Sequence, residues 1–241
     1  MRATCVIAAT LTGCQFVEEV RVDAAQVSWG GQVQVDQSFS VGEATDLVSG
    51  TVTMMTLDGS VLEEATQPIA DNPGYWVFSN APVGETVAIR IDGDPDLLTP
   101  MVWNTTVPPG AALWFTGALF AREPAIHQAY FDALDGIDGI TATPLEDGTV
   151  AALWGEPLDP TQWAGVEIVV TDGAGQQAPV WRLAIDEKGQ LAEANDGPID
   201  LFIAPNLQPG TVTVRIGTQE TTWPAQGGDM LSAIFYELET P

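Results

Sequence analysis

The sequence has very few basic side chains. Among 241 residues there are 33 Asp or Glu but only 7 Lys or Arg, of which Lys188 is the single lysine, and the formal charge is −26 at pH 7. This charge repels phosphate backbones, so we expect no nucleic-acid partner. Charged residues make up only 17% of the chain, so the imbalance comes from missing bases rather than from acidic tracts. Solubility is the simplest reason for it.

Residues that usually carry catalysis are scarce as well. The single histidine, His127, belongs to no His-x-x-Glu or His-Glu-x-x-His pattern, which excludes the common zinc peptidase sites. A Ser/His/Asp triad would need the same histidine, and the sequence has no Gly-x-Ser-x-Gly elbow and no phosphate-binding loop. We therefore expect a protein that is not an enzyme.

Long apolar runs are also missing. The longest uncharged apolar stretch, residues 111–121, has 11 residues, whereas a membrane-spanning helix needs about 20. No segment of this sequence is therefore expected to cross a bilayer as a helix.

The N-terminus has the layout of an export signal. Arg2 is followed by an uncharged stretch and then by Leu11-Thr12-Gly13-Cys14. The last four residues resemble a bacterial lipobox, which implies that residues 1–13 are a removed signal peptide and that Cys14 is lipidated. The expected location is the cell envelope, at the outer membrane or cell surface, with the lipid at Cys14 as the membrane anchor. The alternative is an apolar first β-strand.

Short β-rich segments separated by turn residues follow. Residues 47–55 are rich in Val and Thr and precede Asp58-Gly59. The aromatic and β-branched residues 75–78 lie between two Asn- and Pro-containing turns. Residues 86–91, 101–107 and 111–120 continue the pattern, and this spacing is typical of a sandwich or barrel.

The second half of the sequence repeats the first. Residues 148–154 resemble residues 50–55, Asp172-Gly173 follows a strand-like run as Asp58-Gly59 does, and residues 206–216 match residues 80–91. Between the halves, residues 124–134 have helical periodicity.

The ordered motifs resemble the carboxypeptidase regulatory-like family of transthyretin-like or immunoglobulin-like sandwiches. The resemblance rests on residues 50–52, 71–78 and 80–84, and more loosely on the second half. It implies an all-β protein of β-sandwich modules. Together with the repeat and the helical periodicity, this predicts two β-sandwich units, 14–121 and 141–241, with a short connecting helix at 122–140. Such modules resemble accessory or surface domains and bring no catalytic residues.

One loop has a metal-like pattern. Asp92, Asp94 and Asp96 have the 1-3-5 spacing of a calcium loop, but Leu97 and Trp103 stand where an EF-hand needs Gly and Glu. A looser calcium site and a solvated turn both remain open, and no other cofactor is expected.

Eight tryptophans are the remaining lead. Trp76 is expected in a core strand, whereas exposed tryptophans among the others would stack on sugars. These others are expected either to pack in a core or to form such a surface: Trp29, Trp103, Trp154, Trp163, Trp181 and Trp223. The expected function is a non-catalytic envelope protein for protein interaction, adhesion or envelope assembly; the alternative is a carbohydrate- or calcium-binding module.

Overall fold

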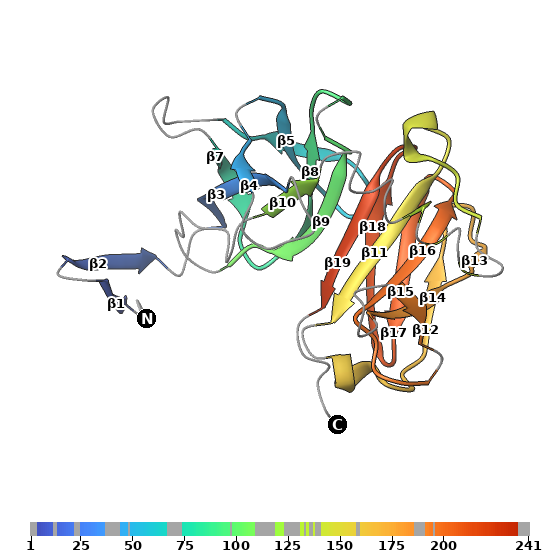
Figure 1. The fold of residues 1–241 in the computed structure, drawn as a ribbon. Helices are drawn as coiled ribbons and strands as arrows, with labels where there is room; N and C mark the ends of the chain where they lie inside the picture. The colour runs from blue at the N-terminus through green and yellow to red at the C-terminus, as the bar shows by residue number, and fades with distance from the viewer. Residues whose placement is uncertain are drawn as a thin grey trace.

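The computed structural model describes residues 4–11, 14–21, 25–36, 44–47, 49–66, 74–96, 98–108, 119–122, 131–132, 134, 137, 141–157, 160–185, 191–194 and 196–235. This part of the chain is mostly β (Figure 1), with short 3-10 turns η1 (Leu145–Asp147) and η2 (Pro160–Trp163). It contains no helix of seven or more residues, and none long and apolar enough to span a membrane.

Strands from both halves of the chain form one nine-stranded sheet, which we call the central sheet. In order across the sheet, the strands are β15 (Leu191–Glu193), β14 (Trp181–Ile185), β16 (Leu201–Leu207), β11 (Ala151–Pro157), β19 (Met230–Phe235), β9 (Met101–Thr106), β8 (Thr86–Asp92), β5 (Thr51–Met55) and β6 (Val61–Glu64). The halves meet where β19 runs parallel to β9, with Leu231 opposite Val102 (Figure 1). We call this strand pair the seam.

Two smaller sheets accompany the central sheet. The N-terminal layer contains β3 (Gln26–Asp36), β4 (Ala44–Asp46), β7 (Tyr75–Pro82) and β10 (Leu119–Arg122). The C-terminal layer has the order β13 (Gln177–Ala178), β12 (Ile168–Thr171), β17 (Gly210–Ile216) and β18 (Gln219–Ala225). A separate hairpin consists of β1 (Thr4–Leu11) and β2 (Cys14–Arg21).

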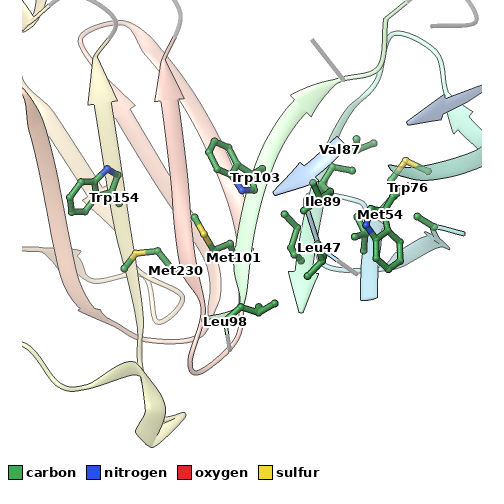
Figure 2. Close-up of a cluster of buried hydrophobic side chains, with 14 of the residues drawn as sticks. Leu47, Met54, Trp76, Val87, Ile89, Leu98, Met101, Trp103, Trp154 and Met230 are labelled. Atoms are coloured by element: carbon green, nitrogen blue, oxygen red, sulfur yellow. The ribbon is translucent and has the colours of Figure 1, made fainter. Parts of the chain in front are cut away.

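Inner strands of the central sheet are buried on both faces, because their successive residues enter different cores. Ile89 and Trp103 belong to the first hydrophobic cluster, together with Trp29 of the N-terminal layer. Ala88 and Val102, the alternate residues, belong to the second cluster, which includes residues of the C-terminal layer. Figure 2 labels ten residues of the first cluster, which runs across the seam: Leu47, Met54, Trp76, Val87, Ile89, Leu98, Met101, Trp103, Trp154 and Met230.

Polar contacts reinforce the seam. The Arg90 guanidinium on β8 lies 2.8 Å from the carboxylate of Asp229, which is fully buried just before β19. Beside it, the Asn104 amide on β9 donates hydrogen bonds to the Thr221 hydroxyl and the Thr222 carbonyl of β18. The halves are therefore joined by a strand pair, a buried ion pair and side-chain hydrogen bonds.

The repeated turn has the same role in each half, but the strand pairing around it differs. The turn after Asn80 takes the chain from the N-terminal layer to the central sheet, and the turn after Asn206 takes it from the central sheet to the C-terminal layer. However, β5 pairs with the strand after its turn, β8, whereas β11 pairs with the strand before its turn, β16. The structure confirms the mostly β class. Its strands form several sheets, which are not clearly two separate copies of one sandwich.

The Asp-Gly turns predicted from the sequence are confirmed. In the first, the amide of Ser60 donates to the Asp58 carboxylate. In the second, Asp172 accepts hydrogen bonds from the amides of Ala174 and Gln176. Gly173 packs closely on the turn between β16 and β17, so that a Cβ at this position would lie 2.2 Å from the Pro209 carbonyl oxygen. Only glycine fits that position.

The predicted connecting helix falls largely outside the described residues, which omit 123–130. Residues 131, 132 and 134 are helical, and Phe131 and Leu134 are buried in the first cluster. The connection that the described residues do reveal is the seam, which the sequence pattern did not predict.

Breaking the ion pair at the seam should destabilise the whole protein. Asp229→Ala leaves the largely buried Arg90 charge with only the more distant and partly exposed Asp92 as a partner, and we expect the free energy of unfolding to fall by about 3 kcal/mol in urea titrations. Asp92→Ala is the control, because its side chain is 42% exposed at 3.3 Å from Arg90, and should cost about 1 kcal/mol or less. Equal losses in the two variants would contradict a structural role for the buried pair.

Asn206 provides a second test. Its backbone is left-handed (φ +60°), its side-chain oxygen accepts from the Thr143 amide at 2.7 Å, and its side-chain nitrogen donates to the Thr141 carbonyl at 2.6 Å. Asn206→Ala should cost about 2–3 kcal/mol, since it adds backbone strain and removes both bonds. Asn206→Gly should cost less, because only the bonds are lost. Thermal unfolding that ranks the glycine variant below the alanine variant would refute this explanation.

Candidate functional site

The aspartates of the predicted calcium loop lie at and just after the end of β8, of which Asp92 is the last residue. Asp92 accepts a hydrogen bond from the Gly93 amide at 2.8 Å, and its other carboxylate oxygen lies 3.3 Å from the Arg90 guanidinium. The Asp94 carboxylate accepts from the Asp96 amide at 3.0 Å, and both of these residues are exposed. The loop is thus a hydrogen-bonded turn whose first aspartate belongs to the charged cluster at the seam.

Calcium binding by this loop stays a prediction. Across the residues that the structure describes, no three His, Cys, Asp or Glu side chains form a group that could hold a metal ion. Binding by all three aspartates would require Asp92 to turn away from Arg90.

The tryptophans singled out by the sequence pack into the cores. Of the seven that the structure describes, six are buried: Trp29, Trp76, Trp103, Trp154, Trp163 and Trp223. Trp181 is partly buried against the first cluster. Trp29 stacks on Phe78 with 6.0 Å between ring centroids, and Trp163 lies 5.7 Å from Phe202. Trp114 lies outside the described residues. Among the described tryptophans, only Trp181 is therefore partly exposed, and the other six do not present a surface for stacking on a sugar.

Cys14, the predicted lipidation site, is the first residue of β2 and lies opposite Leu11 in the hairpin. In the described part of the chain, β1 and β2 pair only with each other. The hairpin projects away from the rest of the protein (Figure 1). His127 and Lys188 lie outside the described residues.

Asp229 is the most strongly perturbed acid that the structure describes. Burial raises its pKa to about 6, against the opposing effect of the Arg90 charge. One carboxylate oxygen accepts from the Gln226 amide at 2.7 Å and from Arg90, while the other has no hydrogen-bond partner among the described residues. Sequence reasoning missed this residue because its partner is 139 positions away and no local motif marks either one.

A cavity of about 240 Å³ lies beside the start of β12 and β14. Its lining residues are Gly165, Val166, Glu167, Ile168, Val180, Arg182 and Asp196. The Arg182 guanidinium donates hydrogen bonds to the carbonyls of Val166 and Trp163, which fixes it in place. Burial lowers the pKa of Arg182 from its ordinary value, and the nearby Asp196 charge opposes that shift. No sequence motif marked this site.

Comparisons with known proteins assign no family. No family model and no curated protein matches the chain. Among solved structures, the Bacillus anthracis TIE protein aligns with 92% of this chain at 11% sequence identity and a TM-score of 0.30, which is too low to support any argument. The chain covers only 38% of that protein's length. The resemblance to the carboxypeptidase regulatory-like family stays a prediction.

The pH dependence of stability tests the environment of Asp229. Since the folded protein raises this pKa from 3.8 to about 6, the folded state binds the proton more tightly. The stabilisation that protonated Asp229 gives to the folded state is fully present below pH 3.8 and is lost as the pH rises through 6. A pKa shift of two units corresponds to about 3 kcal/mol of folding free energy. On acidification from pH 7.5 to pH 5, which stays above the isoelectric point of about 4.1, the folded state should gain roughly 1 kcal/mol of this stabilisation.

The measurement is urea unfolding of the wild type and of Asp229→Asn at both pH values. The wild type should gain about 1 kcal/mol relative to the variant at pH 5, because other titrating groups cancel in the comparison. A wild type that loses stability relative to the variant on acidification would show that the carboxylate has a lowered pKa.

Proposed function

We propose that the protein is a non-catalytic, lipid-anchored component of the cell envelope, exposed at the outer membrane or cell surface. Its β-sheet body would serve protein interaction, adhesion or envelope assembly. The observation that carries the proposal is the hairpin around Cys14. Cleavage before Cys14 would remove β1 and would break no strand pairing of the body, since β1 pairs only with β2 in the described chain. The lipobox-like Leu11-Thr12-Gly13-Cys14 supplies the chemistry of attachment.

The body suits a binding role better than a catalytic one. We propose that it consists of two immunoglobulin-like or transthyretin-like units that share the central sheet. The two hydrophobic clusters support this, because each includes side chains of the central sheet and of one outer layer. The perturbed Asp229 is buried within the seam and pairs with Arg90, which is consistent with a structural rather than a catalytic carboxylate.

The charge of the processed chain fits exposure to solvent. Loss of residues 1–13 removes Arg2 and no acidic residue, which leaves 6 basic against 33 acidic residues and a formal charge of −27. Such a body is repelled by anionic headgroups, so the lipid, rather than the protein surface, would hold it at the membrane.

Replacing Cys14 tests the anchor. In a bacterial host that processes lipoproteins, we expect the wild-type protein to begin at an acylated Cys14 and to partition into detergent. Cys14→Ser should retain residues 1–13 and partition into the aqueous phase, because it has no thiol to acylate. The readouts are intact-protein mass spectrometry and detergent phase separation.

Cys5→Ser is the matched control, since Cys5 lies in the segment to be removed and the mature product should be identical to the wild type. An exported wild-type protein that still carries an unmodified Met1 would refute the anchor.

A further inference from the structure

The cavity beside Arg182 has the features of a small-ligand site. One wall is the segment 165–168, which leads from η2 into β12, and the other is formed by Val180 and Arg182 at β14. Asp196, from the connection between β15 and β16, completes it. Elements distant in sequence thus converge on one hollow of about 240 Å³.

Arg182 is held in position before any ligand arrives. Two of its guanidinium nitrogens donate to the carbonyls of Trp163 and Val166, so the side chain loses little freedom on binding. Its Nε is buried, and in the described chain it has no hydrogen-bond partner. Of the five N–H donors of the guanidinium, two are used on these carbonyls and the Nε–H is out of the solvent's reach, so two remain for a ligand that brings an acceptor.

The other side chains that line the cavity are of two kinds, acidic and aliphatic. Glu167 and Asp196 are exposed acids that bring carboxylate oxygens, which only accept hydrogen bonds, and Glu167 also lies 3.2 Å from Arg215. Val166, Ile168 and Val180 are partly buried and give the hollow an aliphatic side. The ligand that fits must therefore accept and donate hydrogen bonds and also present a C–H surface.

These requirements select among ligand classes. An anion would meet two carboxylates and the strongly negative charge of the whole chain, and a cation would meet the fixed charge of Arg182. A hydroxyl group is neutral and both accepts and donates. The volume lies below the roughly 300–1,000 Å³ of sites for drug-sized ligands, so it suits a single ring.

We infer that this cavity binds a neutral polyhydroxylated ring, that is, one sugar residue of a glycan. The inference goes beyond the proposed function and does not depend on acylation of Cys14. Recognition of the sugar would not use a tryptophan ring, because no tryptophan is among the residues that line this cavity.

The test is an NMR titration of the full chain labelled with ¹⁵N. Methyl glycosides of glucose, galactose and mannose are added separately up to about 50 mM, because a ring of this size is expected to bind with a dissociation constant on the order of 1–10 mM. Acetate and methylammonium are the charged probes. We expect saturable shifts of the backbone amides of Gly165, Val166 and Arg182 with at least one glycoside and with neither charged probe.

Two variants tie binding to the cavity. Val180→Trp fills the hollow and should abolish the shifts, and Asp196→Asn removes a charged acceptor and should weaken binding about tenfold or more. Val61→Trp at an exposed position of β6 and Glu220→Gln on β18 are the matched controls and should bind as the wild type does.

Either of two results would overturn the inference: no saturable shift with any glycoside, or shifts that Val180→Trp and Asp196→Asn leave unchanged. Saturable binding of acetate or methylammonium without a glycoside would overturn the ligand class. Because the readout is independent of processing at Cys14, a failure here leaves the proposed anchor to its own test.

Discussion

The seam between β9 and β19, with the buried pair of Arg90 and Asp229 beside it, is the constraint on which the joining of the two halves depends. Removing a carboxylate from water costs several kcal/mol, and Asp229 tolerates it because a guanidinium from the other half lies 2.8 Å away. The pair lies beside the three residue pairs through which β19 joins β9. Without that junction the central sheet would become two shorter sheets, each with a newly exposed edge.

A sheet that spans both halves explains the arrangement of the layers. Both of its faces carry large apolar side chains, so each must be covered. The edge strand of the C-terminal layer, β18, is also covered. Asn104 donates a hydrogen bond to the Thr222 carbonyl, and the turn at Gly59 lies against Pro224. The exposed edge of the central sheet at β6 carries Val61 and Leu62, which are 66% and 44% exposed. There a bulge and the exposed Glu64 disfavour pairing with another strand, while the Glu63 carboxylate accepts hydrogen bonds from the backbone amides of Ser79 and Asn80 on β7.

What the sequence could predict was local. The β-rich segments around residues 75–78 and 86–91 form β7 and β8, and the Asp-Gly turns form as expected, because turn residues and β-branched runs act over a few positions. The tryptophans were ambiguous, since burial depends on which faces other strands cover. Repetition of the motif correctly indicated a repeated turn between layers but could not show that β5 and β11 choose different partners.

The sequence patterns could not predict the main features of the site, because the residues that form them are far apart in the sequence and meet only in the folded protein. Arg90 and Asp229 are 139 residues apart, and the lining of the Arg182 cavity comes from three separate segments. The three aspartates at and after the end of β8 did stand out, yet their spacing alone did not show that Arg90, two residues before Asp92 on the same strand, pairs with the first of them. Tertiary contacts decide what such residues do.

If the seam holds the two halves together, they unfold as one cooperative body. Amide hydrogen exchange of residues 101–103 and 230–232, compared with the inner strands β8 and β16, tests it most directly. The seam amides should be as protected as the most protected amides of either half and should exchange only through global unfolding. Rapid exchange at the seam while β8 and β16 stay protected would mean that the halves open independently, and it would contradict this account.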